Sequence, residues 1–171
     1  MDEQDFEDTI AAIYPRIRRA ALLLCQGNVW DADDLAQETL LQAADGWSRF
    51  RGHSRVETWL YAILMNQHRR RRRSAQRILR RWLGWLENRG QQANREAPDA
   101  GLLATEWKAE LWDAVSKLPE AQRETVVLRF AEGLSYEDIA QVLKCPLGTV
   151  KSRLHLALGA LEKGLKQHVR K

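Results

Sequence analysis

Apolar side chains recur every three or four residues along most of this 171-residue chain, and no long stretch alternates apolar with polar residues. This spacing places apolar side chains on one face of an α-helix, because a helix completes a turn in about 3.6 residues. Only four prolines interrupt the pattern. The sequence therefore predicts an all-α fold.

Three helices are expected in the first half of the chain. Residues 3–27 form one, kinked or restarted at Pro15, which lacks a backbone donor. Residues 31–46 form a second, with acidic side chains in its first turn, where the helix dipole favours anions. Ser54 and Glu57 match the S-x-x-E capping box and open a third helix that runs into a block of arginines. The inward positions of the second and third helices are Leu35, Thr39, Leu40, Ala43, Trp47, Trp59, Leu60, Ile63 and Leu64.

A break in the apolar pattern divides the chain. Residues 90–101, GQQANREAPDAG, contain no large apolar side chain and cannot contribute to a hydrophobic core. Helical periodicity resumes near Leu102. We therefore expect two small helical domains, residues 1–73 and residues 105–171, joined by a flexible linker over 74–104 that is partly helical at its start.

The second domain has the punctuation of a helix-turn-helix. A helix that starts near residue 119 should end before Gly133, because glycine readily takes the left-handed conformation that follows a helix. Ser135, with Asp138 three residues on, caps a short helix, and the turn at 144–146 leads directly into another. Two helices joined by so short a turn form a helix-turn-helix. The inward side chains of the helix before Gly133 are expected to be Val126, Val127 and Phe130.

The last helix should present two faces. Its expected buried stripe, at about 100° per residue, consists of Val150, Leu154, Ala157 and Leu161. Lys151, Ser152 and His155 point outward, and polar side chains at the start of such a helix suit the major groove of DNA. Arg153 flanks the buried face, and Leu156 lies beyond the stripe and should be partly exposed.

Charge is unevenly distributed along the chain. The formal net charge is +4, yet residues 1–48 carry 3 Lys/Arg and 10 Asp/Glu, residues 49–89 carry 12 and 2, and residues 90–171 carry 12 and 11. The basic block includes five consecutive arginines, Arg69 to Arg73. Such a tract is either a solvated, disordered run or a localisation signal, or else a phosphate-binding surface. An acidic block beside a basic block predicts two partners of opposite charge, with nucleic acid as the first candidate for the polyanion.

Several classes of protein are disfavoured. No apolar stretch approaches the roughly 20 residues of a membrane span, and the acidic N-terminus is the opposite of a secretory signal, so a cytoplasmic protein is expected. Cys25 and Cys145 are interpreted as reduced thiols. A glycine-rich phosphate loop, a metal-ligand cluster and a nucleophile–base pattern are all missing, so we predict no enzyme, no cofactor and no metal. A membrane-surface role for residues 77–90, RILRRWLGWLENRG, stays open beside packing on the first domain or on an inhibitor.

Two motifs carry a resemblance to a known family. Residues 118–161, which include VVLRFAEGLSYEDIAQVLKCPLGTVKSRL, resemble region 4 of the extracytoplasmic-function (ECF) sigma factors of the sigma-70 family. DADDLAQETLLQAADGW, residues 31–47, and TWLYAILMNQHRRRRR, residues 58–73, resemble region 2 of the same family. The resemblance implies a subunit that binds core RNA polymerase and directs it to promoters, for a stress or envelope-signal regulon, with an anti-sigma factor as a further partner.

The resemblance also implies roles for individual residues. The polymerase-binding set on the outward side of the second helix is Asp34, Gln37, Glu38 and Leu41. The residues matched to recognition of the −10 promoter element and its flanking phosphates are Arg49, Arg51, His53, Arg55, Asn66, Arg70, Arg71, Arg72 and Arg73. Those matched to the −35 element are Thr149, Lys151, Ser152, Arg153 and His155. Trp59 and Tyr61 could stack on an unpaired base, although Trp59 lies on the apolar stripe and is expected to pack in the core.

The chain departs from the family at two of these positions. Arg70 stands where an aspartate is frequent, and Leu156 stands where an arginine is frequent. The alternative function is a stand-alone helix-turn-helix regulator that binds duplex DNA without polymerase. That alternative leaves the acidic helix and the linker unexplained.

Overall fold

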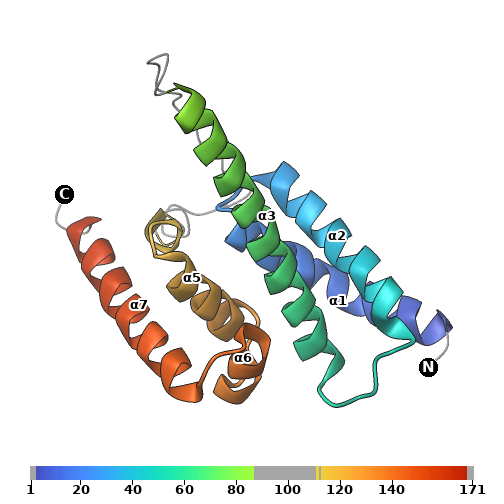
Figure 1. Ribbon diagram of the computed structural model, residues 1–171. Coiled ribbons are helices and arrows are strands. Elements are labelled where there is room, and N and C mark those ends of the chain that lie inside the picture. Colours follow the sequence, from blue (N-terminus) through green and yellow to red (C-terminus); the bar gives the residue numbers. More distant parts are fainter. Residues whose placement is uncertain (1–2, 87–110, 112, 169–171) are drawn as a thin grey trace.

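The computed structural model describes residues 3–86, 111 and 113–168, with side chains over residues 5–78, 111 and 113–165. The regular elements of this part are α1 (Glu3–Leu24), α2 (Val29–Trp47), α3 (Val56–Leu86), α5 (Glu120–Val126), a π-helix (Val127–Ala131), α6 (Tyr136–Leu143) and α7 (Leu147–His168) (Figure 1). No strand occurs among them, so the all-α prediction is confirmed for the described residues. None of these helices combines the length and apolar character that a membrane span requires.

The first domain is a bundle of α1, α2 and α3. Ile17, Leu35, Leu60 and Leu64 are fully buried where the three helices meet, in agreement with the apolar spacing. α1 runs through Pro15 as one helix, so of the two outcomes predicted at that residue, a kink or a restart, the restart is wrong. α1 also ends three residues earlier than predicted, because the next turn places two consecutive residues at positive φ.

The starts of α2 and α3 both differ from the prediction. α2 begins at Val29, because the Asn28 side chain caps it by accepting a hydrogen bond from the Asp31 amide at 3.1 Å. α3 begins at Val56, and the Arg55 carbonyl accepts its first hydrogen bond, from the Trp59 amide at 3.1 Å. The predicted capping box, which required Ser54 as the cap, is therefore wrong by one residue.

The second domain confirms most of the helix-turn-helix prediction. Ser135 caps α6 by accepting from the Asp138 amide at 3.0 Å, and Gly133 has the positive φ of 71° expected after a helix. Val126 and Val127 are buried as predicted, but the Phe130 side chain is 61% exposed. The wider turn of the π-helix over Val127–Ala131 shifts the phase of the helix by about one residue, which turns Phe130 to solvent.

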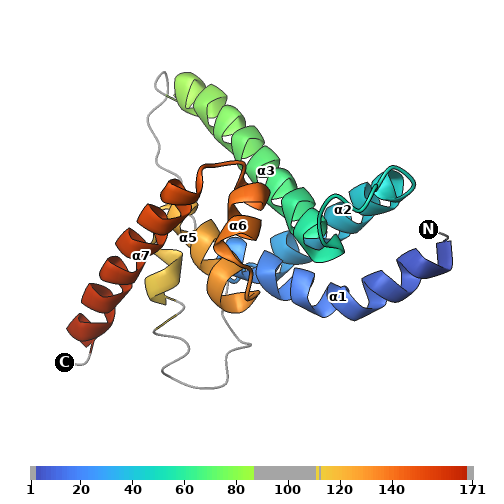
Figure 2. The same ribbon diagram turned by 90° about the horizontal axis from the view of Figure 1, so that it is seen from below.

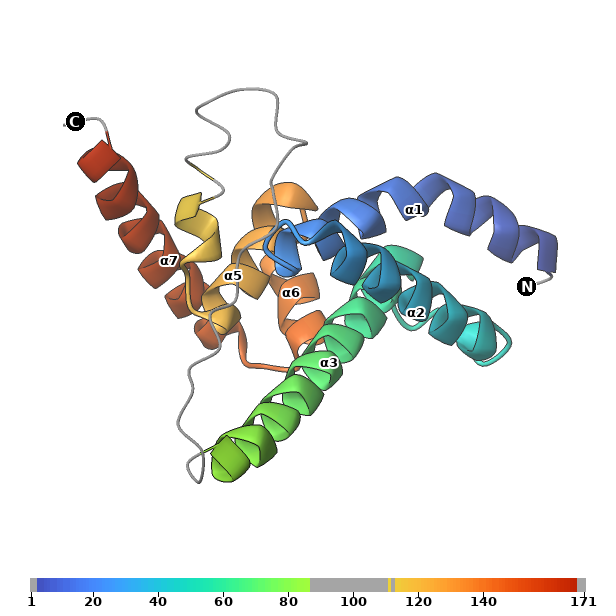
Figure 3. The same cartoon turned by 90° about the horizontal axis from the view of Figure 1, so that it is seen from above.

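The two domains pack against each other. α6 lies beside α3, the π-helix lies against α1, and α7 lies on the far side of α5 and α6 from α3 (Figures 1, 2 and 3). The sequence predicted two domains on a linker and contained no expectation of this interface. The boundaries at residues 73 and 105 stay a prediction, since α3 continues to Leu86 and residues 87–110 lie outside the described part.

Candidate functional site

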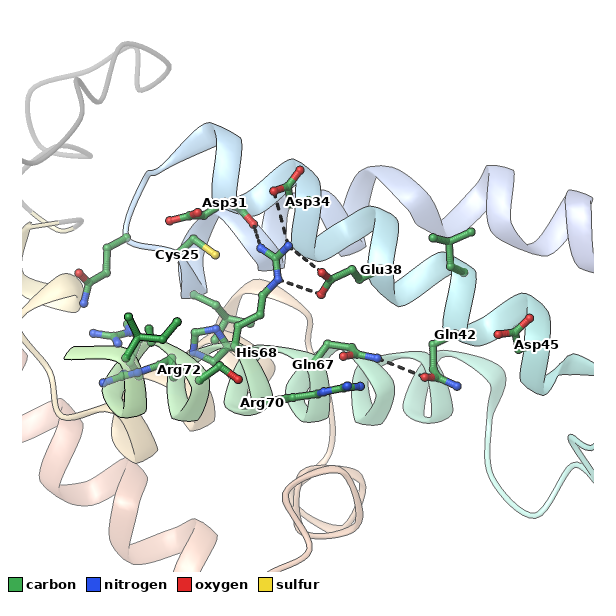
Figure 4. A pocket seen from close by; sticks show the side chains of 18 residues that line it. Cys25, Asp31, Asp34, Glu38, Gln42, Asp45, Gln67, His68, Arg70 and Arg72 are labelled. Atoms are coloured by element: carbon green, nitrogen blue, oxygen red, sulfur yellow. Dashed lines mark hydrogen bonds and ion pairs between the residues drawn. The ribbon is translucent and has the colours of Figure 1, made fainter. Parts of the chain in front are cut away.

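Three of the four predicted polymerase-binding residues, Asp34, Glu38 and Leu41, line one side of an open groove. Asp34, Gln37 and Leu41 are exposed on α2, Glu38 is partly exposed, and Leu41 exposes 69% of its surface although it is apolar. The groove has a volume of about 1000 Å³ and lies between α2 and α3 (Figure 4). An exposed leucine flanked by carboxylates is suited to a partner that is partly apolar and partly basic.

Arg71 crosses this groove and joins the two predicted sites. Its guanidinium donates to both carboxylate oxygens of Glu38, at 2.8 and 2.9 Å, and to the Asp31 carbonyl at 3.1 Å, and it lies 3.6 Å from Asp34 (Figure 4). The hydrogen bond from Arg71 holds the pKa of Glu38 below its usual value, and burial opposes this shift only in part. A side chain predicted to bind DNA phosphate is thus bound to the acidic face of α2.

A smaller pocket lies at the loop before α3. It has a volume of about 350 Å³ and is lined by Gly46, Arg49, Phe50, Arg51, His53, Ser54 and Trp59. Trp59 is half-buried and packs against Phe50 and Trp47, at ring-centroid distances of 4.9 and 6.1 Å. An aromatic wall beside exposed basic side chains can receive a flat base and neutralise its phosphate.

Tyr61 contradicts its prediction as a stacking residue. The side chain is fully buried, and its hydroxyl donates a hydrogen bond to the Glu132 carboxylate of the second domain. Burial, together with that hydrogen bond, raises the pKa of Tyr61. The helical spacing of apolar residues in α3 could not distinguish a buried Tyr61 from one that stacks on a base, because its hydrogen-bond partner lies 71 residues away in the sequence.

Glu132 is the centre of the domain interface, and the sequence analysis missed it. Its carboxylate has no exposed surface and accepts from Arg16 at 3.3 Å and from Arg19 at 3.2 Å, in addition to Tyr61. Arg16 also donates to the Glu132 carbonyl at 2.9 Å, and Arg19 to the Ala131 carbonyl at 2.7 Å. No sequence pattern marks this site, because the arginines precede the glutamate by more than 110 residues.

Further ion pairs connect α3 and its loop to the second domain. Arg55 pairs with Asp138, which also accepts from Thr58 at 3.2 Å. Burial raises the pKa of Asp138, but hydrogen bonds from Ser135 and Thr58 and the charge of Arg55 outweigh it, so the net pKa is lowered. Two more ion pairs join the helices α3 and α5, namely Arg69 with Glu124 at 2.6 Å and Arg72 with Glu120 at 2.9 Å. The Nε2 atom of His68 lies 3.5 Å from a carboxylate oxygen of Glu120.

His68 is buried in this contact, with 5% of its surface exposed, and its Nε2 atom has no hydrogen-bond partner. Burial, followed by the charges of Arg72, Arg123, Arg69 and Arg71, lowers its pKa to about 4. His68, Glu120 and Glu124 place possible metal-ligand atoms within 4.8 Å of one another. Both carboxylates already neutralise guanidinium groups, however, and the surrounding arginines repel a cation, so this cluster does not have the charge of a metal site.

The predicted faces of α7 are confirmed. The stripe of Val150, Leu154, Ala157 and Leu161 is buried, Lys151, Ser152 and His155 are exposed, and Leu156 is 58% exposed. Thr149 and Arg153 are half-buried. Most residues predicted to contact the −10 region are exposed, namely Arg49, Arg51, His53, Asn66, Arg70 and Arg73. The other three are paired with carboxylates, namely Arg55, Arg71 and Arg72.

Comparison with known proteins agrees with this geometry. The model of Sigma-70 region 2 matches residues 9–78, and the model of Sigma-70 region 4 matches residues 108–161. The RNA polymerase sigma-H factor of Pseudomonas aeruginosa is 37% identical over 146 residues, covering 82% of this chain and 76% of that protein. The ECF RNA polymerase sigma factor EcfG of Rhodopseudomonas palustris is 38% identical over 159 residues, covering 90% and 81%.

A solved structure extends the likeness to both domains together. The sigma factor RpoE of Bartonella quintana, in complex with the anti-sigma factor NepR, matches with a TM-score of 0.78 at 28% identity, over 95% of this chain and 98% of that one. The sequence relatives, the two family regions in order and the helix-turn-helix lead to the same conclusion. The chain belongs to the ECF sigma factors of the sigma-70 family, which direct RNA polymerase to promoters and are not enzymes.

Proposed function

We propose that this sigma factor docks on core RNA polymerase through Asp34, Gln37, Glu38 and Leu41. The observation that carries the proposal is the exposed apolar Leu41 among acidic side chains on one face of α2. Such a face binds a basic helical surface, because charge directs the encounter and the leucine provides the apolar contact. The work of the protein then takes place in the cytoplasm, where polymerase and chromosome lie.

The promoter contacts are divided between the two domains. The pocket beside Arg49, Arg51 and His53 receives a base of the −10 element, and the exposed face of α7 reads the −35 element. Asn66, Arg70 and Arg73 contact backbone phosphates. The paired arginines Arg55, Arg71 and Arg72 contact phosphates once their ion pairs are broken. The half-buried Thr149 and Arg153 contact the DNA when it lies against α7.

The packed arrangement has a consequence for promoter binding. Arg55 and Arg72 are paired with carboxylates of the second domain, so separation of the two domains frees both guanidinium groups for DNA phosphates. The likeness to a sigma factor solved together with an anti-sigma factor, over both domains, supports the view that the packed state is the one an anti-sigma factor holds. Polymerase, by contrast, would bind the separated state.

The experiment is run-off transcription with the purified chain, core RNA polymerase and a promoter selected by sequencing transcripts after overexpression. Added core polymerase should convert the chain into a promoter-specific initiator. The double variant Gln37→Ala, Glu38→Lys should lose core binding in a pull-down at moderate salt while it keeps its helical circular dichroism. Sequence-specific binding to the duplex without polymerase would instead indicate a stand-alone regulator. Equal core binding by the double variant and the unchanged chain would contradict the docking face on α2.

A further inference from the structure

A second groove lies where α3 meets the turn between α6 and α7. It has a volume of about 370 Å³ and is lined by Asn66, Arg69, Arg70, Arg73, Arg77 and Lys144. Five of these residues come from one flank of α3, and Lys144 comes from the helix-turn-helix. The groove therefore exists only while the two domains are packed together.

The charges of this groove are not balanced by the protein. Of its cations, Arg69 is bound to Glu124, with distances of 2.6 and 3.0 Å to the two carboxylate oxygens. Arg70, Arg73, Arg77 and Lys144 have no carboxylate within ion-pair distance among the side chains that the structure describes. The residues that line the groove include no acid.

The contrast with the neighbouring arginines is sharp. Arg71 and Arg72 lie on the same helix and are both paired, with Glu38 and Glu120. Packing of the second domain supplies Glu120 to Arg72 and Glu124 to Arg69, and it adds a further cation, Lys144, beside the unpaired arginines of the groove. Like charges brought together in this way destabilise the packed state unless an anion lies between them.

Lys144 is held in place by its backbone. It has the left-handed conformation, with φ of 51°, and its amide donates to the Ala140 and Gln141 carbonyls at the end of α6. The base of its side chain is therefore fixed relative to the helix-turn-helix. An anion bound to Lys144 and to the arginines of α3 would connect the two domains.

We propose that this groove binds a free oligophosphate, an anion of two or more linked phosphates, and that the bound anion holds the domains in the packed state. Guanidinium groups match phosphate oxygens in pairs, and Lys144 adds a point charge. The volume lies in the range of small-molecule sites, roughly 300–1000 Å³. A single phosphate carries at most about two negative charges near neutral pH and does not balance four cations, whereas linked phosphates do. The inference rests on the packed arrangement and not on the promoter contacts proposed above.

The test is isothermal titration of the full chain with sodium tripolyphosphate, without Mg²⁺ and at constant ionic strength. We expect one site per chain. Lys144→Gln and Arg73→Gln should each weaken binding about tenfold, the value of one charge-assisted hydrogen bond. The matched control is Lys163→Gln, which removes the same charge from an exposed site on α7 and should leave the affinity unchanged. Equal losses in Lys144→Gln and Lys163→Gln would show general attraction by a basic protein and would overturn the proposal.

A second measurement separates the free anion from nucleic acid, since both present phosphates. Small-angle scattering should show that tripolyphosphate reduces the radius of gyration of the unchanged chain, or keeps it at its compact value when salt expands it, and that it has no such effect on Lys144→Gln. A short single-stranded oligonucleotide forms the parallel arm. If the oligonucleotide bound in a Lys144-dependent way and tripolyphosphate did not bind, the groove would be a nucleic-acid surface and the proposal would be wrong.

Discussion

The arginine flank of α3 and the outward face of α7 are both basic and both matched to promoter DNA, yet the structure treats them differently. On α3 and its loop, Arg55, Arg71 and Arg72 are each bound to a carboxylate. On α7, Lys151 and His155 remain exposed and without a carboxylate partner among the described side chains. The difference teaches that intramolecular pairing occupies some of the basic side chains of the first domain, namely Arg55, Arg71 and Arg72, while the basic side chains on the outward face of α7 are left available.

The strongest way to break this difference is to remove the centre of the interface. Glu132→Gln cannot balance Arg16 and Arg19, so we expect a loss of about 3 kcal/mol from the packed state, as for other buried pairs that lose one partner. Urea unfolding and the radius of gyration would measure the loss and the separation of the domains. The control is Glu137→Gln, an exposed glutamate of α6, which should change neither quantity. A Glu132→Gln chain as compact and as stable as the original would contradict the importance of this contact.

A second effect follows from His68, which is buried on the paired side of α3 with Glu120 of α5 and several arginines around it. Its pKa is lowered from 6.5 to about 4, so the unfolded chain takes up a proton at a higher pH than the folded chain does. The stability contributed by neutral His68 is complete above the unfolded pKa and is lost as the pH falls from 6.5 toward 4. The slope of this loss reaches at most about 1.4 kcal/mol per pH unit.

The measurement is the free energy of unfolding across this pH window for the chain and for His68→Gln. The variant should lose less stability on acidification, because its side chain binds no proton in either state. Identical pH dependence of the two proteins would mean that His68 protonates as easily in the folded chain as in the unfolded one.

The smallest expected effect concerns the exposed face of α7. Leu156→Ala should change the free energy of unfolding by less than about 0.5 kcal/mol, because Leu156 lies outside the buried stripe. Leu156→Arg should tighten promoter binding by the holoenzyme and steepen the slope of log K against log salt by about 0.9, the value of one phosphate contact. Leu154→Ala, two residues earlier in the buried stripe, is the matched contrast and should cost about 3 kcal/mol. Similar destabilisation by the two alanine variants would mean that the face assigned to DNA is part of the core.

Much of the second domain could be predicted from sequence. The Ser135 cap, the positive φ of Gly133 and the buried stripe of α7 depend on residues within one or two helical turns of each other. Phe130 shows where this reasoning fails. Regular α-helical spacing predicted that Phe130 is buried, but the π-helix changes the direction of the side chains within one turn. No residue type in this segment predicts a π-helix.

The sequence by itself determined that the chain is helical, the Ser135 cap of α6 and the family, because these depend on short-range periodicity and on motifs that are contiguous in the chain. Only the tertiary structure decided which charges are available. The pairing of Arg72 with Glu120 and of Glu132 with Arg16 joins residues that are far apart in the sequence, and Coulomb attraction depends on distance in space and on burial. The five consecutive arginines therefore look equivalent in the sequence. In the folded protein, some of them are neutralised by carboxylates and others remain free to bind an anion.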